Sequence, residues 1–239
     1  MQITSTILNK LSYLIDLVFP SHCPVCVKRS DNHSISPLCS SCWAKIERHN
    51  GRGCRICASV TDYDSTGVCQ ECRAIKPVFD RVITFGIYNG ALKQTIHLMK
   101  FRRLRRLANV LGKEMSLMDI PNADVIMPVP LSNDGLRGRE FNQSAVMAKV
   151  VSKETGIPLD ISSLKKTKET LPQSMLQKRE RIMNVKGAFE VDKDLSGKRV
   201  ILVDDVITTS ATVNECARAL KKAGAEMVTV LTAARSKSD

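Results

Sequence analysis

Val200-Ile201-Leu202-Val203-Asp204-Asp205-Val206-Ile207-Thr208-Thr209-Ser210-Ala211-Thr212 is the most informative segment of the chain. It opens with four consecutive aliphatic residues after a Gly-Lys turn, a run that predicts a buried strand of a parallel sheet. Two carboxylates follow, and a run of small residues then leads into an amphipathic helical pattern that ends at Gly224. The segment therefore predicts a strand, a loop and a helix in succession.

A strand, a loop and a helix N-terminus in this order bind anions in open α/β sheets, because unpaired amide groups and the positive end of the helix dipole face the crevice. Paired carboxylates repel phosphate, but they suit the vicinal hydroxyls of a ribose or a divalent metal ion. We therefore interpret the loop as a site for a ribose 5-phosphate group. The alternative is a turn in which the Asp and Thr residues only cap the helix.

The whole segment resembles the phosphoribosyl pyrophosphate (PRPP) loop of type I phosphoribosyltransferases. The resemblance implies that Asp204 and Asp205 are the catalytic carboxylates and hold the ribose 2- and 3-hydroxyls, with Mg²⁺ between ribose and pyrophosphate oxygens. It also implies that the following turn holds the 5-phosphate, through Thr208, Thr209, Ser210, Ala211 and Thr212. That family usually has glycine where this chain has Ser210. Because glycine adopts positive φ without strain, we expect this loop to be tighter or to use the serine hydroxyl.

The composition is typical of a soluble globular protein, with 43% hydrophobic and 25% charged residues among 239. This length accommodates one core domain and a smaller module. The net charge is +12, from 36 Lys and Arg against 24 Asp and Glu, which favours polyanionic partners such as phosphate ligands or nucleic acid. Aromatic residues make up only 4%, which argues against a stacking surface for single strands over the whole protein.

Residues 1–20 carry apolar side chains at helical spacing, interrupted by Lys10 and Asp16. They contain no uninterrupted apolar span of the kind that a secretion signal or a transmembrane helix needs. We predict an amphipathic helix that packs on the body of the protein, and a cytoplasmic location. A helix that lies on a membrane surface is the alternative.

Eight of the nine cysteines form four C-x-x-C pairs. Each pair places two thiolates on one turn, two pairs complete a tetrahedral Zn²⁺ shell, and cytoplasmic thiols favour metal over disulfides. Two structural zinc ions are therefore predicted, in a double zinc ribbon if the pairs combine sequentially and in a cross-braced module if they alternate. The predicted ligands are Cys23, Cys26, Cys39, Cys42, Cys54, Cys57, Cys69 and Cys72. Cys216, on the apolar face of the helix after the PRPP-type loop, is predicted to belong to the core.

A strongly basic stretch, Lys100-Phe101-Arg102-Arg103-Leu104-Arg105-Arg106, continues a helical pattern that begins at Ala91. Its five cations are Lys100, Arg102, Arg103, Arg105 and Arg106. They form either a solvated helix face held by Phe101, Leu104 and Leu107 or a contact surface for a nucleic-acid backbone. Lys100 is also a candidate for neutralising a pyrophosphate.

The composition changes after Pro77, and apolar runs predict a strand or hairpin at 79–88, strands at 124–129, 187–191 and 226–232, and a helix after Asn142. Several motifs in this half resemble the ComF family: the Pro128-Val129-Pro130-Leu131 turn, the run Arg137-x-Arg139-x-Phe141-Asn142-Gln143, and Gln173, Arg181 and Asn184. Members of that family join an N-terminal double zinc ribbon to a phosphoribosyltransferase domain, and some are competence proteins associated with DNA uptake. The resemblance covers the chain from Cys23 to about Arg235.

The ComF resemblance implies that Arg137 and Arg139 contact pyrophosphate, and that Gln173 and Arg181 belong to a loop that closes over the substrate. The family usually has glycine where this chain has Glu140. A carboxylate there works against anion binding unless it points away or pairs with one of the two arginines.

Together these features predict an α/β fold: a Rossmann-like parallel-sheet phosphoribosyltransferase domain over residues 77–239, preceded by a double zinc ribbon over 21–76. Two functions follow from the resemblance. In one, a PRPP-binding protein acts in DNA uptake and natural competence, with single-stranded DNA and a helicase of the uptake machinery as partners. In the other, an active phosphoribosyltransferase uses a nucleobase or amine acceptor. The sequence shows no acceptor-recognition segment and no general base beyond the two aspartates, so it predicts PRPP binding and leaves transfer open.

Overall fold

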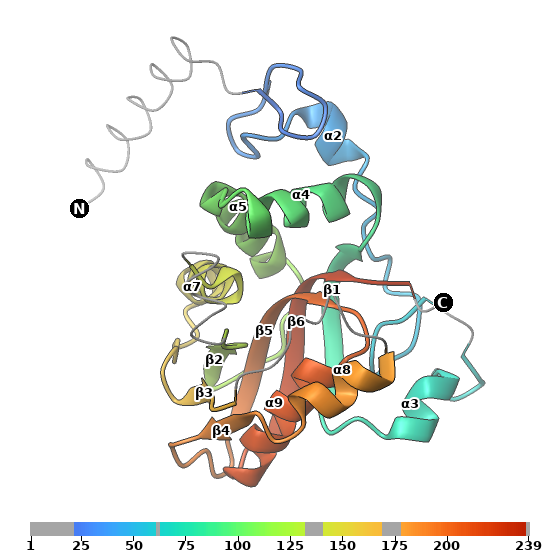
Figure 1. Ribbon diagram of the computed structural model, residues 1–239, viewed down its shortest axis with the longest axis vertical. Helices are drawn as coiled ribbons and strands as arrows, with labels where there is room; N and C mark the ends of the chain where they lie inside the picture. Colours follow the sequence, from blue (N-terminus) through green and yellow to red (C-terminus); the bar gives the residue numbers. More distant parts are fainter. Residues whose placement is uncertain (1–21, 61–62, 132–140, 169–177, 238–239) are drawn as a thin grey trace.

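A computed structural model describes residues 22–60, 63–131, 141–168 and 178–237 (Figure 1). The helix predicted over residues 1–20 lies outside these ranges. Within them the chain builds a four-stranded parallel sheet in the order β1-β6-β5-β2. The strands are β1 (Arg81–Ile87), β2 (Val125–Pro128), β5 (Arg199–Ile207) and β6 (Met227–Arg235). The predicted Rossmann-like parallel sheet is therefore confirmed, and the segment after Pro77 forms a single strand and not a hairpin.

Helices cover both faces of the sheet (Figure 1). On one face lie α4 (Gly90–Phe101), α5 (Arg105–Ser116) and α7 (Gln143–Thr155), and on the other lie α8 (Lys178–Val185) and α9 (Ala211–Lys222). In the described part of the chain, none of the helices is both long and apolar enough to span a membrane.

Strand β5 is buried on both faces because its aliphatic residues alternate between two hydrophobic cores. Ile201 and Val203 pack with α4, α5 and α7, whereas Val200 and Leu202 pack with α9. This arrangement explains why the strand is a continuous apolar run and not an alternating one. Cys216 of α9 is fully buried in the second of these cores, as predicted.

A second, two-stranded sheet lies outside the main one. Strand β3 (Leu164–Lys166) pairs antiparallel with β4 (Phe189–Val191). The sequence predicts β4, but β3 falls in a segment without a clear pattern, and a strand of three residues is too short to produce one.

The eight cysteines of the N-terminal part form two clusters in sequential pairing. Cys23, Cys26, Cys39 and Cys42 make the first cluster, and Cys54, Cys57, Cys69 and Cys72 make the second. The four sulfur atoms of each cluster lie within 4.8 Å of one another. Two sulfur pairs, Cys26–Cys39 and Cys57–Cys69, are 3.5 and 3.7 Å apart. A tetrahedral Zn²⁺ with bonds of about 2.3 Å needs sulfur atoms about 3.8 Å apart, so both clusters fit structural zinc.

A short helix follows the third cysteine of each cluster and is capped by it. The helices are α2 (Ser40–Ala44) and α3 (Gln70–Ile75), and the N-cap residues are Cys39 and Cys69. Each cap thiol accepts a hydrogen bond from the backbone N–H three residues later, at 3.5 Å in both clusters. The two clusters are therefore built in the same way, and only their surroundings differ.

The clusters lie against opposite sides of the sheet. The buried cysteines of the first cluster pack in the same core as α4, α5 and α7, whereas those of the second pack in the core with α9. A division of the chain at residues 76 and 77 stays a prediction, but in the folded protein neither cluster has a separate core of its own.

The protonation of the thiols also favours a divalent metal. A hydrogen bond from Cys72 and the charge of Arg235 lower the pKa of Cys57 to about 5, against the effect of burial, and the bond to Cys57 together with burial raises the pKa of Cys72. In the first cluster, hydrogen bonds from backbone amides outweigh burial and lower the pKa of Cys23 to about 7, whereas burial raises that of Cys42. The thiols of one cluster therefore differ in acidity, and a bound cation stabilises the thiolate form that zinc ligands need.

We expect metal analysis of the purified protein to give two zinc ions per chain, one for each cluster. Cys39→Ser and Cys69→Ser should each lower this content to about one, because a ribbon with three thiolates binds zinc more weakly. Both substitutions should also lower the melting temperature, measured by circular dichroism. A zinc content near zero in the wild-type protein contradicts the assignment.

Candidate functional site

The two carboxylates of the PRPP-type segment stand at the carboxyl end of β5, a central strand of the sheet. Asp205 is buried and Asp204 is half-buried. The loop of residues 208–210 follows directly, and α9 begins at Ala211. Ligands of open parallel sheets bind at this edge, in the crevice where the strands end. The structure therefore produces the predicted order of strand, carboxylates, loop and helix.

Asp204 accepts two hydrogen bonds on the same carboxylate oxygen. The backbone N–H of Asp205 donates at 2.8 Å, and the hydroxyl of Ser144, in the first turn of α7, donates at 3.1 Å. Burial and the neighbouring Asp205 nevertheless raise the pKa of Asp204 to about 7, because they outweigh these bonds and the charge of Lys100. Asp204 therefore titrates near neutral pH, where a change in its surroundings changes its charge.

Asp205 is paired with Lys100. The ammonium of Lys100 lies 2.7 Å from Oδ1 of Asp205, and the two side chains are only 18% and 10% exposed. Lys100 is in the last turn of α4, a helix that crosses the carboxyl edge of the sheet in Figure 1. The site thus contains a partly buried ion pair. Sequence analysis named Lys100 as a candidate for neutralising a pyrophosphate but did not predict its pairing with Asp205, which depends on how α4 packs.

The basic stretch around Lys100 is not one helix face. Helix α4 ends at Phe101, Arg103 has a φ of +58°, and α5 begins at Arg105. Phe101 is 58% exposed and does not anchor the stretch, although Leu107 is fully buried. The side chains of Arg102, Arg103, Arg105 and Arg106 are exposed at this turn between two helices. The five cations therefore separate into Lys100, which belongs to the site, and four arginines at the surface beside it.

The 208–210 loop ends on a residue with left-handed backbone geometry. Ser210 precedes α9 with φ 60° and ψ 2°, and its carbonyl accepts the N–H of Asn214 at 2.9 Å. A residue with a β-carbon pays roughly 1 kcal/mol for this conformation, which glycine adopts freely. The first amide groups of a helix have no partner within the helix, so the α9 N-terminus presents donors on the side of the loop.

Several predicted residues lie outside the described part of the chain. They are Arg137, Arg139, Glu140 and Gln173, and for Arg181 the structure describes only the backbone, in α8. Two residues of the same motif are described. Asn142 caps α7 by accepting the N–H of Ala145 at 3.2 Å and donates to the carbonyl of Val129 at 3.0 Å. Gln143 is 1% exposed, and its Nε2 has no acceptor among the described residues.

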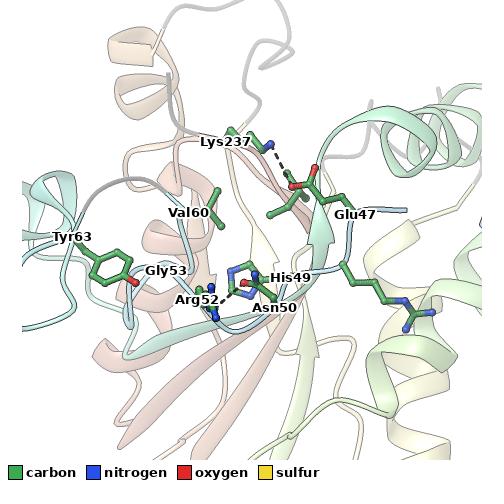
Figure 2. A pocket seen from close by; sticks show the side chains of 10 residues that line it. Glu47, His49, Asn50, Arg52, Gly53, Val60, Tyr63 and Lys237 are labelled. Atoms are coloured by element: carbon green, nitrogen blue, oxygen red, sulfur yellow. Dashed lines mark hydrogen bonds and ion pairs between the residues drawn. The ribbon is translucent and has the colours of Figure 1, made fainter. Parts of the chain in front are cut away.

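A separate cavity of about 370 Å³ lies beyond the edge of β1, beside the segment that joins the two cysteine clusters. In Figure 2, Lys237 lies against Glu47, and the backbone N–H of Arg52 donates to the side chain of Asn50. Burial lowers the pKa of His49, whose Nδ1 accepts the N–H of Gly51 while Nε2 faces the carbonyl of Ala58. Among the predicted PRPP-site residues that the structure describes, none lines this cavity.

Sequence analysis also missed Ser144 and Arg235. Ser144 follows the Asn cap of α7, so its position in a first helical turn was predictable, but its contact with Asp204 depends on how α7 packs against β5. Arg235 is a single cation at the end of a long apolar strand and is 2% exposed. Its partners are backbone carbonyl groups, which carry no sequence signal.

Comparison with known families agrees with this geometry. Residues 14–73 match the double zinc ribbon domain, and residues 142–239 match the phosphoribosyl transferase domain. The first match contains both cysteine clusters, and the second contains Ser144, both aspartates, the 208–210 loop and Arg235. The predicted architecture, a zinc ribbon module followed by a phosphoribosyltransferase fold, is confirmed.

Three characterised relatives align with most of the chain. Competence protein F of Haemophilus influenzae is 32% identical over 212 residues, which cover 83% of this chain and 90% of the relative. The DNA utilization protein YhgH of Escherichia coli K12 is 29% identical over 219 residues, which cover 82% of this chain and 96% of the relative. Competence protein ComFC of Bacillus subtilis is 27% identical over 197 residues, which cover 78% of this chain and 79% of the relative. With its double zinc ribbon and phosphoribosyltransferase domain in this order, the chain belongs to the ComF family.

Proposed function

We propose that this protein binds PRPP at the carboxyl end of β5. The observation that supports this most is the Asp204–Asp205 pair placed directly before a loop and a helix N-terminus. In the proposed complex the two carboxylates accept hydrogen bonds from the ribose hydroxyls. The amides and hydroxyls of residues 208–212 hold the 5-phosphate, as helix N-termini do for other anions.

Lys100 provides the cation that such a site needs. Two adjacent carboxylates repel a pyrophosphate, and the ammonium 2.7 Å from Asp205 reduces this repulsion. The predicted pyrophosphate ligands Arg137 and Arg139 would add charge from the segment before α7. The carboxylates are also hard oxygen ligands of the kind that Mg²⁺ prefers, and Mg²⁺ bound with PRPP would neutralise the pyrophosphate as a leaving group.

The proposed cellular role is in DNA uptake. It is supported by the names of the relatives, which refer to competence and DNA utilization, and by the four exposed arginines beside the site. Single-stranded DNA and a helicase of the uptake machinery are the proposed partners, and a cytoplasmic location follows from such a role. PRPP would then act as a metabolite signal that the DNA-handling protein senses.

The alternative is an active phosphoribosyltransferase with a nucleobase or amine acceptor. It is favoured by the intact pair of aspartates, because a binding protein needs fewer of the groups that stabilise a transition state. Release of pyrophosphate from PRPP in the presence of candidate acceptors distinguishes the two functions. If pyrophosphate is released faster with one acceptor than without it, the protein is an enzyme. If PRPP binds and no pyrophosphate is released, the protein is a sensor.

Calorimetric titration of the protein with PRPP in the presence of Mg²⁺ should show binding to one site per chain. Asp204→Asn together with Asp205→Asn should weaken this binding more than about tenfold, equivalent to about 1.4 kcal/mol, because the ribose hydroxyls lose the charged acceptors and face neutral amides with one acceptor oxygen each. Asp192→Asn is the matched control, since Asp192 also pairs with a lysine but lies at an exposed position after β4. The absence of heat from the wild-type protein at millimolar PRPP would falsify the proposal.

The affinity for PRPP should rise with pH through neutrality. Because the pKa of Asp204 is raised to about 7, its carboxyl is mostly protonated at pH 6 and mostly ionised at pH 8. Only the ionised form accepts hydrogen bonds on both oxygens, so the association constant should increase about tenfold over this range.

Asp204→Asn isolates this effect, because the phosphate groups of PRPP titrate identically with both proteins. The variant should lose most of the extra pH dependence. Parallel pH profiles for the wild-type protein and the variant contradict a role for Asp204 in binding.

Binding of a fluorescent single-stranded oligonucleotide should weaken as salt increases. Arg102→Ala with Arg105→Ala should make the log–log salt dependence shallower by about 1.4, since each lost phosphate contact contributes about 0.7. Lys149→Ala with Lys153→Ala is the matched control, because both lysines are exposed on α7. Equal salt dependence for all three proteins contradicts contact between DNA and this turn.

A further inference from the structure

Arg235, the last residue of β6, is among the largest fully buried side chains of the described chain. Its register partner on β5 is Ile207, the residue directly before the 208–210 loop. A buried guanidinium is costly unless its donors are used, so its bonding partners identify what it stabilises.

The hydrogen bonds of Arg235 connect two distant parts of the chain. Nε donates to the carbonyl of Cys57 at 3.0 Å, and Nη1 donates to the carbonyl of Ile207 at 3.2 Å and to that of Thr208. Cys57 belongs to the second cysteine cluster, and Thr208 is the first residue of the loop. Because the guanidinium is planar and rigid, it fixes the distance and the angle between these carbonyl groups.

The carbonyl of Cys57 is held in place by the cluster around it. The preceding carbonyl, of Ile56, accepts the N–H of Val82 in β1 at 2.7 Å, and the N–H of Ala58 donates to the carbonyl of Cys54 at 2.8 Å. The thiols of Cys54 and Cys57 are two of the four predicted zinc ligands. The folded turn of the second cluster therefore fixes the Cys57 carbonyl, and this carbonyl in turn fixes the guanidinium of Arg235 that bonds to the loop.

The loop does not pack tightly on this cluster. A small cavity of about 60 Å³ separates Cys57 and Cys72 from residues 209–211, and Arg235 lines it. Side-chain packing alone therefore does not position the loop. A second polar link lies nearby, where the side chain of Asn214 in α9 accepts the N–H of Val78 at 2.7 Å.

The first cluster provides a natural comparison. It has the same cap geometry, with Cys39 in the role of Cys69, but its cysteines pack in the core on the other side of the sheet. In both clusters the carbonyls of the first and third cysteines accept N–H groups of their own ribbon, from Val27 and Trp43 in the first and from Ala58 and Arg73 in the second. Arg235 bonds instead to the carbonyl of the second cysteine of its cluster, Cys57.

We propose that Arg235 is a positioning residue that makes the shape of the 208–210 loop depend on an intact second cysteine cluster. Zinc bound by Cys54, Cys57, Cys69 and Cys72 would then support the ligand site at a distance, whereas zinc in the first cluster would not. The assignment of the loop to a 5-phosphate rests on the proposed function, but the mechanical link between cluster and loop does not.

Amide hydrogen exchange, measured by mass spectrometry on the full-length, zinc-loaded protein, tests the link without any ligand. In Arg235→Met the peptide that contains residues 206–212 should exchange about tenfold faster, while the peptide of α5 stays as protected as in the wild-type protein. Arg235→Lys keeps a cation with fewer donors, so the exchange rate of this peptide should lie between those of the wild-type protein and Arg235→Met. Unchanged protection of the loop in both variants overturns the proposal.

The matched cysteine variants test the same link from the other side. Cys69→Ser should increase exchange in residues 206–212, and Cys39→Ser should leave it unchanged, although both remove the N-cap ligand of a zinc ribbon. Equal effects of the two variants on the loop contradict the proposal. This comparison remains decisive if Arg235→Met does not fold.

PRPP titration of Arg235→Lys separates this inference from the proposed function. If wild-type protein binds PRPP, the variant should bind about tenfold more weakly at a temperature where both are folded, because the loop is less ordered before binding. Unchanged affinity, despite a loosened loop, contradicts a role of the loop in phosphate binding. If wild-type protein does not bind PRPP, the ligand assignment fails while the exchange result still decides the link.

Discussion

The charge of two adjacent carboxylates, at the end of a strand buried on both faces, is the constraint on which the site depends. Such groups are unstable in a low-dielectric environment unless donors and a cation surround them. The chain supplies an ammonium from α4, a hydroxyl from α7 and an amide from β5 itself. Two helices, α4 and α7, therefore supply polar groups to one end of β5, and apolar packing brings them near it.

The cysteine clusters add a second kind of constraint. Both have the same local construction, yet one lies in the core that carries Lys100's helix and the other in the core that carries the helix after the loop. A zinc ribbon is commonly treated as an independent appendage. Here each ribbon shares one of the two cores that flank the sheet, and the second accepts a hydrogen bond from Arg235, whose guanidinium also bonds to the backbone beside the candidate site.

Much of the fold follows from local sequence. The run before Asp204 predicts a strand buried on both sides, and the C-x-x-C spacing predicts two metal clusters, because both signals depend on neighbouring residues only. The break between α4 and α5 was not predictable, since Arg103 adopts positive φ without a glycine. The pairing of Lys100 with Asp205 and the bonds of Arg235 depend on sheet order, which brings together residues far apart in sequence. Because every residue has a backbone carbonyl group, the sequence does not indicate which of them Arg235 bonds.

The bond between Arg235 and Cys57 joins residues separated by 178 positions. During synthesis Cys57 leaves the ribosome long before Arg235 does. The second ribbon can bind its metal and contact β1 early, through the bond from the N–H of Val82 to the carbonyl of Ile56, but its link to the loop cannot form until β6 has joined the sheet between β1 and β5. Closing such long loops is slow and leaves apolar surface exposed in the meantime. The hydrogen-bonded link between the second cluster and the 208–210 loop therefore forms only after β6 has entered the sheet, later than the local structure of the ribbon itself.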